Sequence, residues 1–558
     1  MITIQGKGVS AGVGIGPLYF YRRATAEIKR YTVEDTEAEW HRFKGAQTGA
    51  IEQLGVLAEQ ARKEAGDEAA MLFETHQMMA EDLDYEEAIE NLINEEKLNA
   101  EAAVSDVAEQ FSEMFAAMDD AYMQARAADV KDVSQRILGI LCGVVQGGIA
   151  SEVPVLLAAD DLAPSETIQL DKSKILGFVT AGGSGSSHTA ILARTMGIPA
   201  IVGVGEALKP EYEGRQVIAD GSTGALVIDP DDDTRDRLMK KREEQMRLQR
   251  LLETLKGQAN VTKDGKTIRI YCNIGSPEDV HAVQINDGGG IGLFRSEFLY
   301  LNSKDYPTED EQFEAYKTVL SDMDGKEVII RTLDIGADKQ IGYFNLPKEE
   351  NPAMGMRALR ICLTRPEIFR TQLRALFRAS AFGKLGIMFP MVTSVWEVRE
   401  AKRMCEEVKR DLKKEGIPYG DVQIGVMIET PAAAVCSDRL AKEVDFFSIG
   451  TNDLTQYTLA CDRQNNDLGR FYDPHHLSVL RLIQMVTENA HKNGIWVGIC
   501  GELGADLTLT ETFLAIGVDE LSVTPRSVLP LRNAVRMTDT RETAPRILAD
   551  LAEDYTAR

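Results

Sequence analysis

The chain has 558 residues and a mass of 61.5 kDa, so its length alone predicts three or four domains. It is 44% hydrophobic and has no run of 18 or more apolar residues, so we expect buried cores and no membrane span. The first residues lack the charged and apolar regions of a secretory signal, and the seven cysteines form no CxxC pair. We therefore expect a soluble cytoplasmic protein without a disulfide framework or a structural zinc site.

The formal net charge is −26, and it is unevenly distributed. Residues 25–140 contain 27 Asp and Glu but 10 Lys and Arg. Such an acidic chain disfavours nucleic acid, whose phosphates it would repel. The acidic block is suited to attracting a small basic protein. The alternative, which holds for any one carboxylate, is that acidic helices keep the protein in solution.

The sequence of the N-terminal region predicts two domains, one of which is inserted in the other. Residues 1–22 contain a short strand pattern and the glycine-rich loop Gly8–Gly16. Residues 33–142 are almost free of proline and carry long amphipathic patterns, which predict an all-helical domain over 23–144. Short strands then return over 145–229, so the helical domain is predicted to be an insertion in a small α/β domain. These strands are Val153–Leu157, Ile175–Thr180, Ala200–Val202, Val217–Ala219 and Leu226–Ile228.

One histidine lies where a buried strand, a glycine/serine loop and a helix meet. The strand Ile175–Thr180 is followed by the loop 183–187 and by helical sequence from Thr189 to Met196, which stops at Gly197. A loop of this kind before a helix N-terminus favours an anion, because unpaired N–H groups and the helix dipole point outward. His188 is therefore a candidate phosphoryl acceptor, with a capping or structural histidine as the alternative.

A charged linker helix is predicted over 230–260, and a (β/α)8 barrel over 261–558. Eight strand-like runs alternate there with helical sequence, which is typical of a closed parallel sheet. The runs are Ile268–Ile274, Ile291–Arg295, Val328–Asp334, Leu385–Met391, Ile424–Glu429, Phe446–Gly450, Trp496–Cys500 and Glu520–Thr524.

Polar residues stand where these runs end, which is where such barrels carry their active sites. The arginines Arg295, Arg331 and Arg463 suit a multiply charged anion, because a guanidinium grips phosphate or carboxylate oxygens with two donors. Glu429 and Asp453 are hard oxygen ligands for Mg²⁺. Cys500 suits a proton donor, since a free thiol has a pKa of about 8.5. Singly, each arginine could be a structural ion pair and the cysteine a core residue.

Over essentially its whole length the sequence resembles the PEP-utilising enzyme family, and within it the phosphoenolpyruvate–protein phosphotransferases (Enzyme I of the bacterial sugar phosphotransferase system). The motifs that carry the resemblance follow the family's order along the chain. They are Arg126–Asp132, Ser187–Arg194, Gly290–Glu297, Arg331–Gly336, Asn351–Arg357, Gly425–Pro431, Ser448–Tyr457 and Cys500–Glu502.

The resemblance implies a fold and a mechanism. The fold is a phosphohistidine α/β domain with an inserted helical domain, a linker helix and a TIM barrel. Phosphoenolpyruvate (PEP) would bind in the barrel with Mg²⁺ on Glu429 and Asp453. His188 would take the phosphoryl group, Cys500 would protonate the enolate to give pyruvate, and the carrier protein HPr would then accept the group on the helical domain. The substrate would be held by Arg295, Arg331, Asn452, Asp453 and Arg463, with Arg357 as a helper.

The resemblance further implies a homodimer formed through the barrel and a phosphohistidine domain that swings on the linker helix. Two alternatives stay open: an enzyme like PEP synthase or pyruvate phosphate dikinase, and a regulatory scaffold. Among the other histidines, His76 is expected to be structural or at the partner surface. His475 and His476 are expected at a loop or helix start rather than on a metal.

The loop before His188 departs from the family, which has Gly and Arg where this chain has Ser184 and Gly185. Loss of the arginine removes a positive charge near the phosphohistidine, so phosphorylation should be slower or the phosphohistidine less stable. Gly185→Arg should therefore lengthen the half-life of phospho-His188, measured by loss of ³²P label. An unchanged half-life would contradict the hypothesis.

Overall fold

The structure is a computed structural model that describes the chain except for residues 22–27, 66, 118–120, 144–150, 152, 163–165, 167–169, 184–187, 302, 337–340 and 553–558. The chain forms two compact units, Met1–Gln249 and Arg250–Arg558. Within the described ranges, no helix has both the length and the apolar character needed to cross a membrane.

The first unit contains an eight-stranded mixed sheet in the order β1-β8-β7-β3-β4-β5-β6-β2. Strands β3 and β4 pair in parallel although the helical region separates them in sequence, which places the predicted insertion between two neighbouring strands. Strand β4 starts two residues later than expected, because Pro154 has no N–H to donate. The strands are β1 (Ile2–Gln5), β2 (Lys7–Ser10), β3 (Val13–Phe20), β4 (Val155–Ala159), β5 (Ile175–Thr180), β6 (Ala200–Val202), β7 (Gln216–Asp220) and β8 (Ala225–Ile228).

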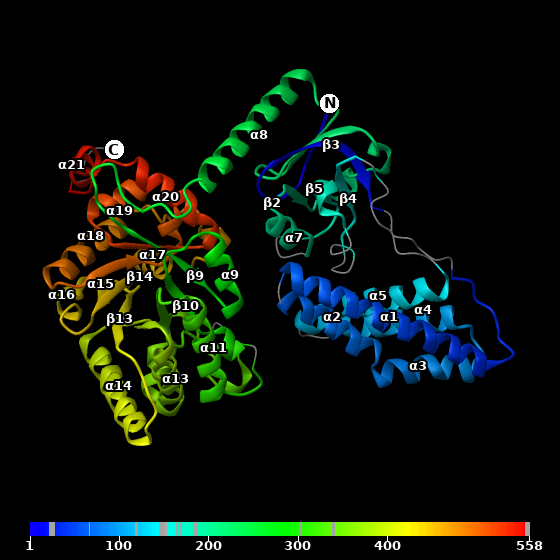
Figure 1. The fold of residues 1–558 in the computed structure, drawn as a ribbon, viewed down its shortest axis with the longest axis horizontal. Coiled ribbons are helices and arrows are strands. Elements are labelled where there is room, and N and C mark those ends of the chain that lie inside the picture. Colours follow the sequence, from blue (N-terminus) through cyan, green and yellow to red (C-terminus); the bar gives the residue numbers. More distant parts are fainter. Residues whose placement is uncertain are drawn as a thin grey trace. The chain divides into compact units, whose positions relative to one another are not determined.

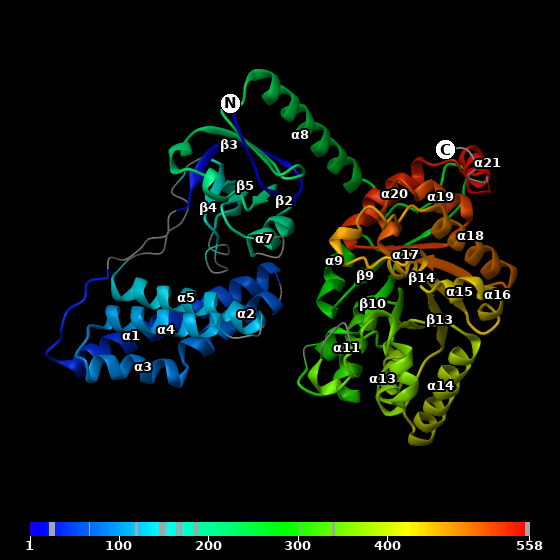
Figure 2. The ribbon, with the colours of Figure 1, turned by 180° about the vertical axis from the view of Figure 1, so that it is seen from behind.

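Five helices form the predicted all-helical part and lie side by side (Figures 1 and 2). Their shared core includes Phe43, Ile89 and Val104, which are fully buried. The helices are α1 (Thr36–Ala65), α2 (Asp67–Ala80), α3 (Leu83–Asn94), α4 (Ala100–Ala116) and α5 (Ala121–Leu141).

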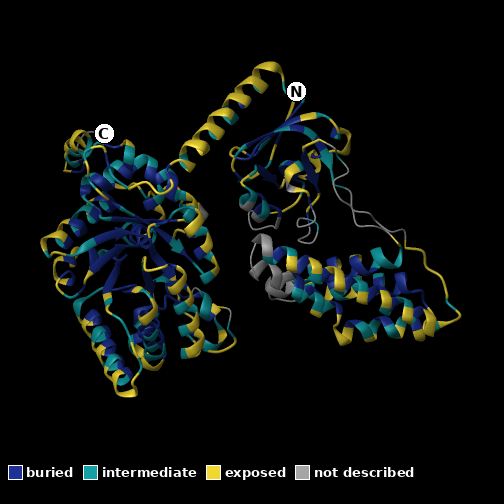
Figure 3. Ribbon diagram, in the orientation of Figure 1, coloured by how far each residue is buried: buried dark blue, intermediate teal, exposed yellow. Residues whose placement is uncertain are grey.

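The linker helix α8 (Asp232–Glu253) is attached to the sheet at its N-terminal half. Leu238 is buried against Val13 and Ile218, and Lys241 Nζ lies 2.6 Å from the buried carboxylate of Asp220. Leu238 is the buried residue of the helix, and the rest of its first half is exposed or partly exposed, so among the described residues the helix is anchored to the sheet at Leu238 and Lys241. Beyond Lys241 the helix is also largely exposed (Figure 3).

The second unit contains a closed barrel of eight parallel strands, β9 to β16, with helices outside it (Figure 1). All eight predicted strands are present. Most of the buried apolar side chains lie between the strands and the surrounding helices. The strands are β9 (Arg269–Ile274), β10 (Ile291–Arg295), β11 (Glu327–Arg331), β12 (Lys384–Phe389), β13 (Val422–Ile428), β14 (Phe446–Ile449), β15 (Trp496–Ile499) and β16 (Glu520–Val523).

The principal outer helices of the barrel follow the strands in sequence. They include α9 (Val280–Ile285), α11 (Glu309–Asp322), α13 (Pro366–Ala379), α14 (Val395–Glu415), α15 (Pro431–Val435), α17 (Thr451–Leu459), α18 (Leu477–Lys492), α19 (Thr510–Ile516), α20 (Val528–Met537) and α21 (Thr540–Ala552).

Candidate functional site

The sequence-predicted barrel residues gather at the C-terminal ends of the strands. Arg295 and Arg331 are the last residues of β10 and β11. Glu429 and Cys500 directly follow β13 and β15. Asn452 and Asp453 lie in the first turn of α17, which begins two residues after β14. This end of the barrel, called the barrel mouth below, brings the predicted set together.

Arg331 is buried in the mouth between two carboxylates. Its guanidinium lies 2.8 Å from Glu297 and 3.0 Å from Asp334. Asp334 also accepts from Arg357 at 2.9 Å, and Arg357 donates to the hydroxyl of Tyr457 at 3.2 Å. Burial disfavours the charged form of Arg331, but the carboxylates of Glu297 and Asp334 favour that form more strongly. The pKa of the Arg331 guanidinium is therefore raised. The buried network therefore fixes two cations in place.

Glu429 is a carboxylate of the mouth whose negative charge is not neutralised by Arg331 and Arg357. Its side chain is fully buried, and its Oε1 accepts the backbone N–H of Met391. Its Oε2 has no hydrogen-bond partner among the described residues. Burial, and next the negative charges of Asp453 and Asp334, raise the pKa of Glu429 to about 8. A buried carboxylate with one open oxygen and a second carboxylate nearby fits a cation ligand.

The pair Glu429 and Asp453 offers part of a metal site rather than a closed cage. In the part of the chain that the structure describes, no group of three or more His, Cys, Asp or Glu side chains surrounds one point. A cation held by two carboxylates keeps positions for water and substrate oxygens, which is the usual arrangement for Mg²⁺.

The outer side of the mouth carries more accessible groups. Arg463 lies 3.9 Å from Asp453, and 36% of its side chain is exposed. The Asn452 side chain donates to Glu502 at 3.1 Å and accepts the Glu502 backbone N–H at 3.0 Å, which fixes its amide. Arg295 is exposed, and no ion pair involving it is found within the described ranges. These side chains are available to an anion that enters the mouth.

Cys500 is buried at the end of β15 beneath these charges. Its thiol points to the carbonyl of Ile449 at 3.7 Å. Burial raises the pKa of the thiol to about 12, while the hydroxyl of Ser448 acts in the opposite direction. The thiol is therefore protonated at neutral pH and able to give a proton to a basic carbon or oxygen.

Two residues at the mouth have strained backbones. Met391 has φ of 56° and Ala358 has φ of 51°, and both are buried. A positive φ costs a side-chain-bearing residue free energy, and such positions gather at functional sites. Met391 supplies the N–H that holds Glu429, and Ala358 follows Arg357 in sequence.

Sequence reasoning assigned no role to Glu297, Asp334, Met391 or Tyr457. The first two lay inside motifs that were noted for their arginines, and an acidic residue near each arginine was the available signal. Met391 acts through its backbone, which sequence does not reveal.

His188 is the first residue of α7 (His188–Met196), as expected for a histidine at a loop–helix junction. The helix ends at Gly197, which has φ of 67° and so adopts the left-handed conformation that closes a helix. Ser184 and Gly185 lie outside the described residues.

Three of the other histidines contact carboxylates or lie at the start of a helix. His76 is fully buried, with its Nε2 3.2 Å from Asp129 and its Nδ1 3.6 Å from Asp132. His475 contacts Asp506, and His476 caps the start of α18.

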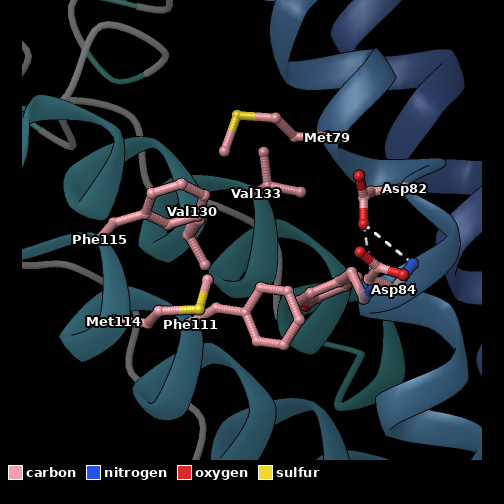
Figure 4. Close-up of a pocket in the computed structure, with 9 residues that line it drawn as sticks. Met79, Asp82, Asp84, Phe111, Met114, Phe115, Val130 and Val133 are labelled. Carbon is pink, nitrogen blue, oxygen red and sulfur yellow. Dashed lines mark hydrogen bonds between the residues drawn. The ribbon is translucent and has the colours of Figure 1, made fainter. Parts of the chain in front are cut away.

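A pocket of about 160 Å³ opens on the helical part (Figure 4). Its walls are mostly apolar, and its edge carries two carboxylates, of which Asp82 caps α3 by accepting from the backbone of Asp84 and Tyr85. The volume is comparable to a cavity that holds one benzene ring. The lining residues are Met79, Asp82, Asp84, Tyr85, Phe111, Met114, Phe115, Val130 and Val133.

Comparison with known families matches the chain in three stretches. They are described as the N-terminal part of PEP-utilising enzymes (residues 5–126), the mobile domain (152–224) and the PEP-binding domain (249–540).

Three curated relatives are each named phosphoenolpyruvate-protein phosphotransferase. The protein of Priestia megaterium is 43% identical over 98% of this chain and 95% of its own length. That of Staphylococcus carnosus (strain TM300) is 42% identical over 99% of both chains. That of Bacillus subtilis (strain 168) is 43% identical over 96% of this chain and 94% of its own.

The two arginines at the ends of β10 and β11 should differ in what they do for stability. Arg331→Ala leaves Glu297 buried without its cation and Asp334 with Arg357 alone, and should lower the unfolding free energy of the barrel by about 3 to 5 kcal/mol. Arg295→Ala removes an exposed side chain and should change it by less than about 0.5 kcal/mol. Denaturant unfolding measures the unfolding free energy of each variant. An equal loss in the two variants would contradict the conclusion that Arg331 balances buried carboxylates.

Proposed function

We propose a route for the phosphoryl group through this chain, which belongs to the PEP-utilising enzyme family and is a phosphoenolpyruvate–protein phosphotransferase. The group passes from PEP to His188 and then to a histidine of the carrier protein HPr, with release of pyruvate, as the first step of sugar uptake. The observation that carries the barrel half of this route is Glu429. Its open oxygen lies in a mouth that also contains buried arginines and a protonated thiol.

In this proposal PEP is held by positively charged side chains and by hydrogen-bond donors in fixed positions. Arg295 and Arg463, which are exposed, would grip its phosphate and carboxylate oxygens, with Asn452 adding a polar contact. Arg331 would present its remaining N–H groups from a fixed position, and Arg357 would support it through Asp334. Preorganised donors of this kind supply much of the catalysis of phosphoryl transfer.

Glu429 and Asp453 would hold Mg²⁺, which supplies neutralisation of negative charge on the substrate oxygens. The fit rests on the open Oε2 of Glu429 and on the like charge of Asp453 beside it. Asp453 would therefore serve both the metal and the substrate.

The chemistry of the chain itself needs two groups. Nε2 of His188 would attack the phosphorus, and the P–O bond to the enolate would break. The Cys500 thiol would then give its proton to the methylene carbon of the enolate and form pyruvate. Burial keeps that thiol protonated until a strong base is formed next to it.

HPr would dock on the acidic helical part. The pocket there takes one apolar side chain, and Asp82 and Asp84 at its edge favour a basic surface around that side chain. The free C-terminal half of α8 would let the phosphohistidine domain visit both sites. We include in the proposal a homodimer formed through the barrel and a cytoplasmic location.

The proposal assigns each part of the chain a task. Residues 1–22 and 145–229 form the phosphohistidine domain, and residues 23–144 form the HPr-binding domain. Residues 230–260 form the linker helix, and residues 261–558 form the PEP-binding barrel.

The test is transfer of ³²P from labelled PEP in the presence of Mg²⁺, with and without HPr. Label should appear on the enzyme from PEP alone and move to HPr when HPr is added, and His188→Ala should abolish both. Label that needs ATP would favour the dikinase class. Label that stays on the enzyme would favour a regulatory scaffold.

Glu429→Gln should separate stability from activity. The variant replaces a carboxyl group whose ionised form is disfavoured by burial and by Asp453 and Asp334, so the protein in EDTA should unfold at an equal or higher temperature than the wild type. Phosphorylation of His188 should fall by about a hundredfold or more, because a ligand to the metal is lost. Added Mg²⁺ and PEP should raise the unfolding temperature of the wild type but not of the variant. A lower unfolding temperature of Glu429→Gln in EDTA would contradict the conclusion that the negative charge of Glu429 is unfavourable without a metal.

A further inference from the structure

A second acidic group is buried in the barrel, below the mouth. Glu520 is the first residue of β16 and is fully buried. Neither of its carboxyl oxygens has a hydrogen-bond partner among the described residues. The route proposed above makes no use of it. A buried carboxyl without partners is costly to keep, so its position calls for a reason.

The barrel is built to hold this carboxyl inside it. Two glycines, one on the adjacent strand β15 and one on β10 beyond β9, face it, and a Cβ added at Gly498 would clash with Glu520 Oε2. A Cβ added at Gly292 would clash with Oε1 and would lie 2.6 Å from the hydroxyl of Ser522. The carboxyl and the hydroxyl therefore face the same point of the interior.

The interior of the barrel has a polar side and an apolar side. The apolar side is a cluster that also contains Cys500 and contacts Trp496, and its other members are Leu293, Ile329, Met388, Met427 and Phe446. Apolar side chains of this kind are usual inside such barrels. The polar side runs from the N-terminal ends of the strands up to the thiol of Cys500. It consists of Arg269, Tyr271 and Asn273 on β9, Ser448 on β14, and Glu520 and Ser522 on β16.

At its upper end the polar side reaches Cys500. Asn273 donates to the carbonyl of Cys500 at 3.0 Å and accepts from the hydroxyl of Ser522 at 2.6 Å. The hydroxyl of Ser448 lies beside the thiol, and a negative charge on Glu520 would raise the pKa of that thiol. Glu520 and Cys500 thus belong to one connected interior region.

At its lower end the polar side meets solvent. The hydroxyl of Tyr271 donates to Glu327 at 2.9 Å, and Glu327 lies 3.6 Å from Arg269. The side chain of Arg269 is 38% exposed and covers the ring of Trp496. The titratable groups that face Glu520 are therefore Arg269 and Tyr271 on β9, Glu327 on β11, and Cys500 above it, while Cys272 on β9 points to the outer face of the barrel.

We propose that Glu520 is a proton-relay residue that returns a proton to Cys500 from the lower end of the barrel while pyruvate still covers the mouth. The inference rests on the proposed function, in which Cys500 loses its proton to the enolate. The carboxyl of Glu520 gives its proton, through the neighbouring hydroxyls, to the Cys500 thiolate. The Glu520 carboxylate, facing Arg269, then takes a proton from solvent by way of Glu327 and Tyr271.

The state of Glu520 suits this task. Burial raises its pKa well above the usual value, and Glu327 adds to the effect while Arg269 opposes it. The group therefore rests as a neutral acid and can supply a proton to a thiolate. Arg269 is the cation that makes the brief carboxylate state accessible.

The proposal is tested by hydrogen–deuterium exchange of the pyruvate methyl group. Full-length enzyme is incubated with Mg²⁺ and pyruvate in D₂O, and loss of the methyl protons is followed by ¹H NMR. In this reversal of the last step, Cys500 removes a methyl proton and must replace it with a deuteron while the enolate is bound. Exchange by the wild type and none by Cys500→Ala would establish that Cys500 acts as proposed.

Two variants of Glu520 then distinguish a relay from packing. Glu520→Gln keeps the volume but not the acid, and exchange should fall by at least about tenfold. Glu520→Asp keeps the acid with a shorter side chain, and exchange should stay within about threefold of the wild type. A packing role predicts the reverse order, because Gln fills the space and Asp leaves a cavity.

The outcomes separate the two proposals. If the wild type does not exchange, or if Cys500→Ala does, the role of Cys500 fails and the relay fails with it. If those two behave as expected but Glu520→Gln exchanges like the wild type, the relay alone is overturned. Thermal unfolding of each variant accompanies the exchange measurement. Should Glu520→Gln not fold, Glu520→Met removes the carboxyl together with its desolvation cost, and wild-type exchange by that variant would overturn the relay as well.

Discussion

Charge is buried at the barrel mouth, and the fold can hold it there because almost every ion faces a partner of opposite sign. Asp334 is the shared element, since it contacts both Arg331 and Arg357 and thereby ties the end of β11 to the loop before the next helix. Glu297 completes the balance on the side of β10. Removing any one of these groups would leave a charge in a region that water hardly reaches. This arrangement fixes the two buried arginines of the mouth, and Glu429 remains as the carboxylate that a substrate complex has to balance.

The strained backbone at Met391 has its explanation in the same arrangement. A residue with a positive φ costs about 1 to 3 kcal/mol, which the surrounding packing has to offset. At Met391 the unusual conformation aims an N–H at Oε1 of Glu429 and leaves Oε2 open. A relaxed backbone would lose the donor that fixes this carboxylate. The strain therefore contributes directly to the direction in which the open oxygen points.

The fold was largely predictable because the barrel strands are short apolar runs separated by helical sequence, and that alternation is a local property. The predicted chemistry at the mouth followed from the rule that such strands end at one edge. The partners of the arginines could not be predicted in the same way. Asp334 lies three residues after Arg331 and could have been a surface residue. Its contact with Arg357 depends on a loop conformation that includes the strained Ala358. The anchoring of α8 was missed because one buried leucine and one lysine do not make a stripe.

Glu520 shows why a barrel interior cannot be deduced from strand patterns alone. An acidic residue at the start of a predicted strand is ordinarily taken as a solvent-exposed end, and the sequence Asp519-Glu520 invites that interpretation. The side chain points inward because Gly498 on the adjacent strand β15 and Gly292 on β10 leave room for it. Three distant positions thus cooperate to hold one carboxyl group. Apolar side chains at these positions would be easier to bury, so the polar side of the interior is a departure from what packing alone would favour. Because polar groups occur from the partly exposed Arg269 up to the buried Cys500, they mark the path along which a proton would have to travel between solvent and the thiol.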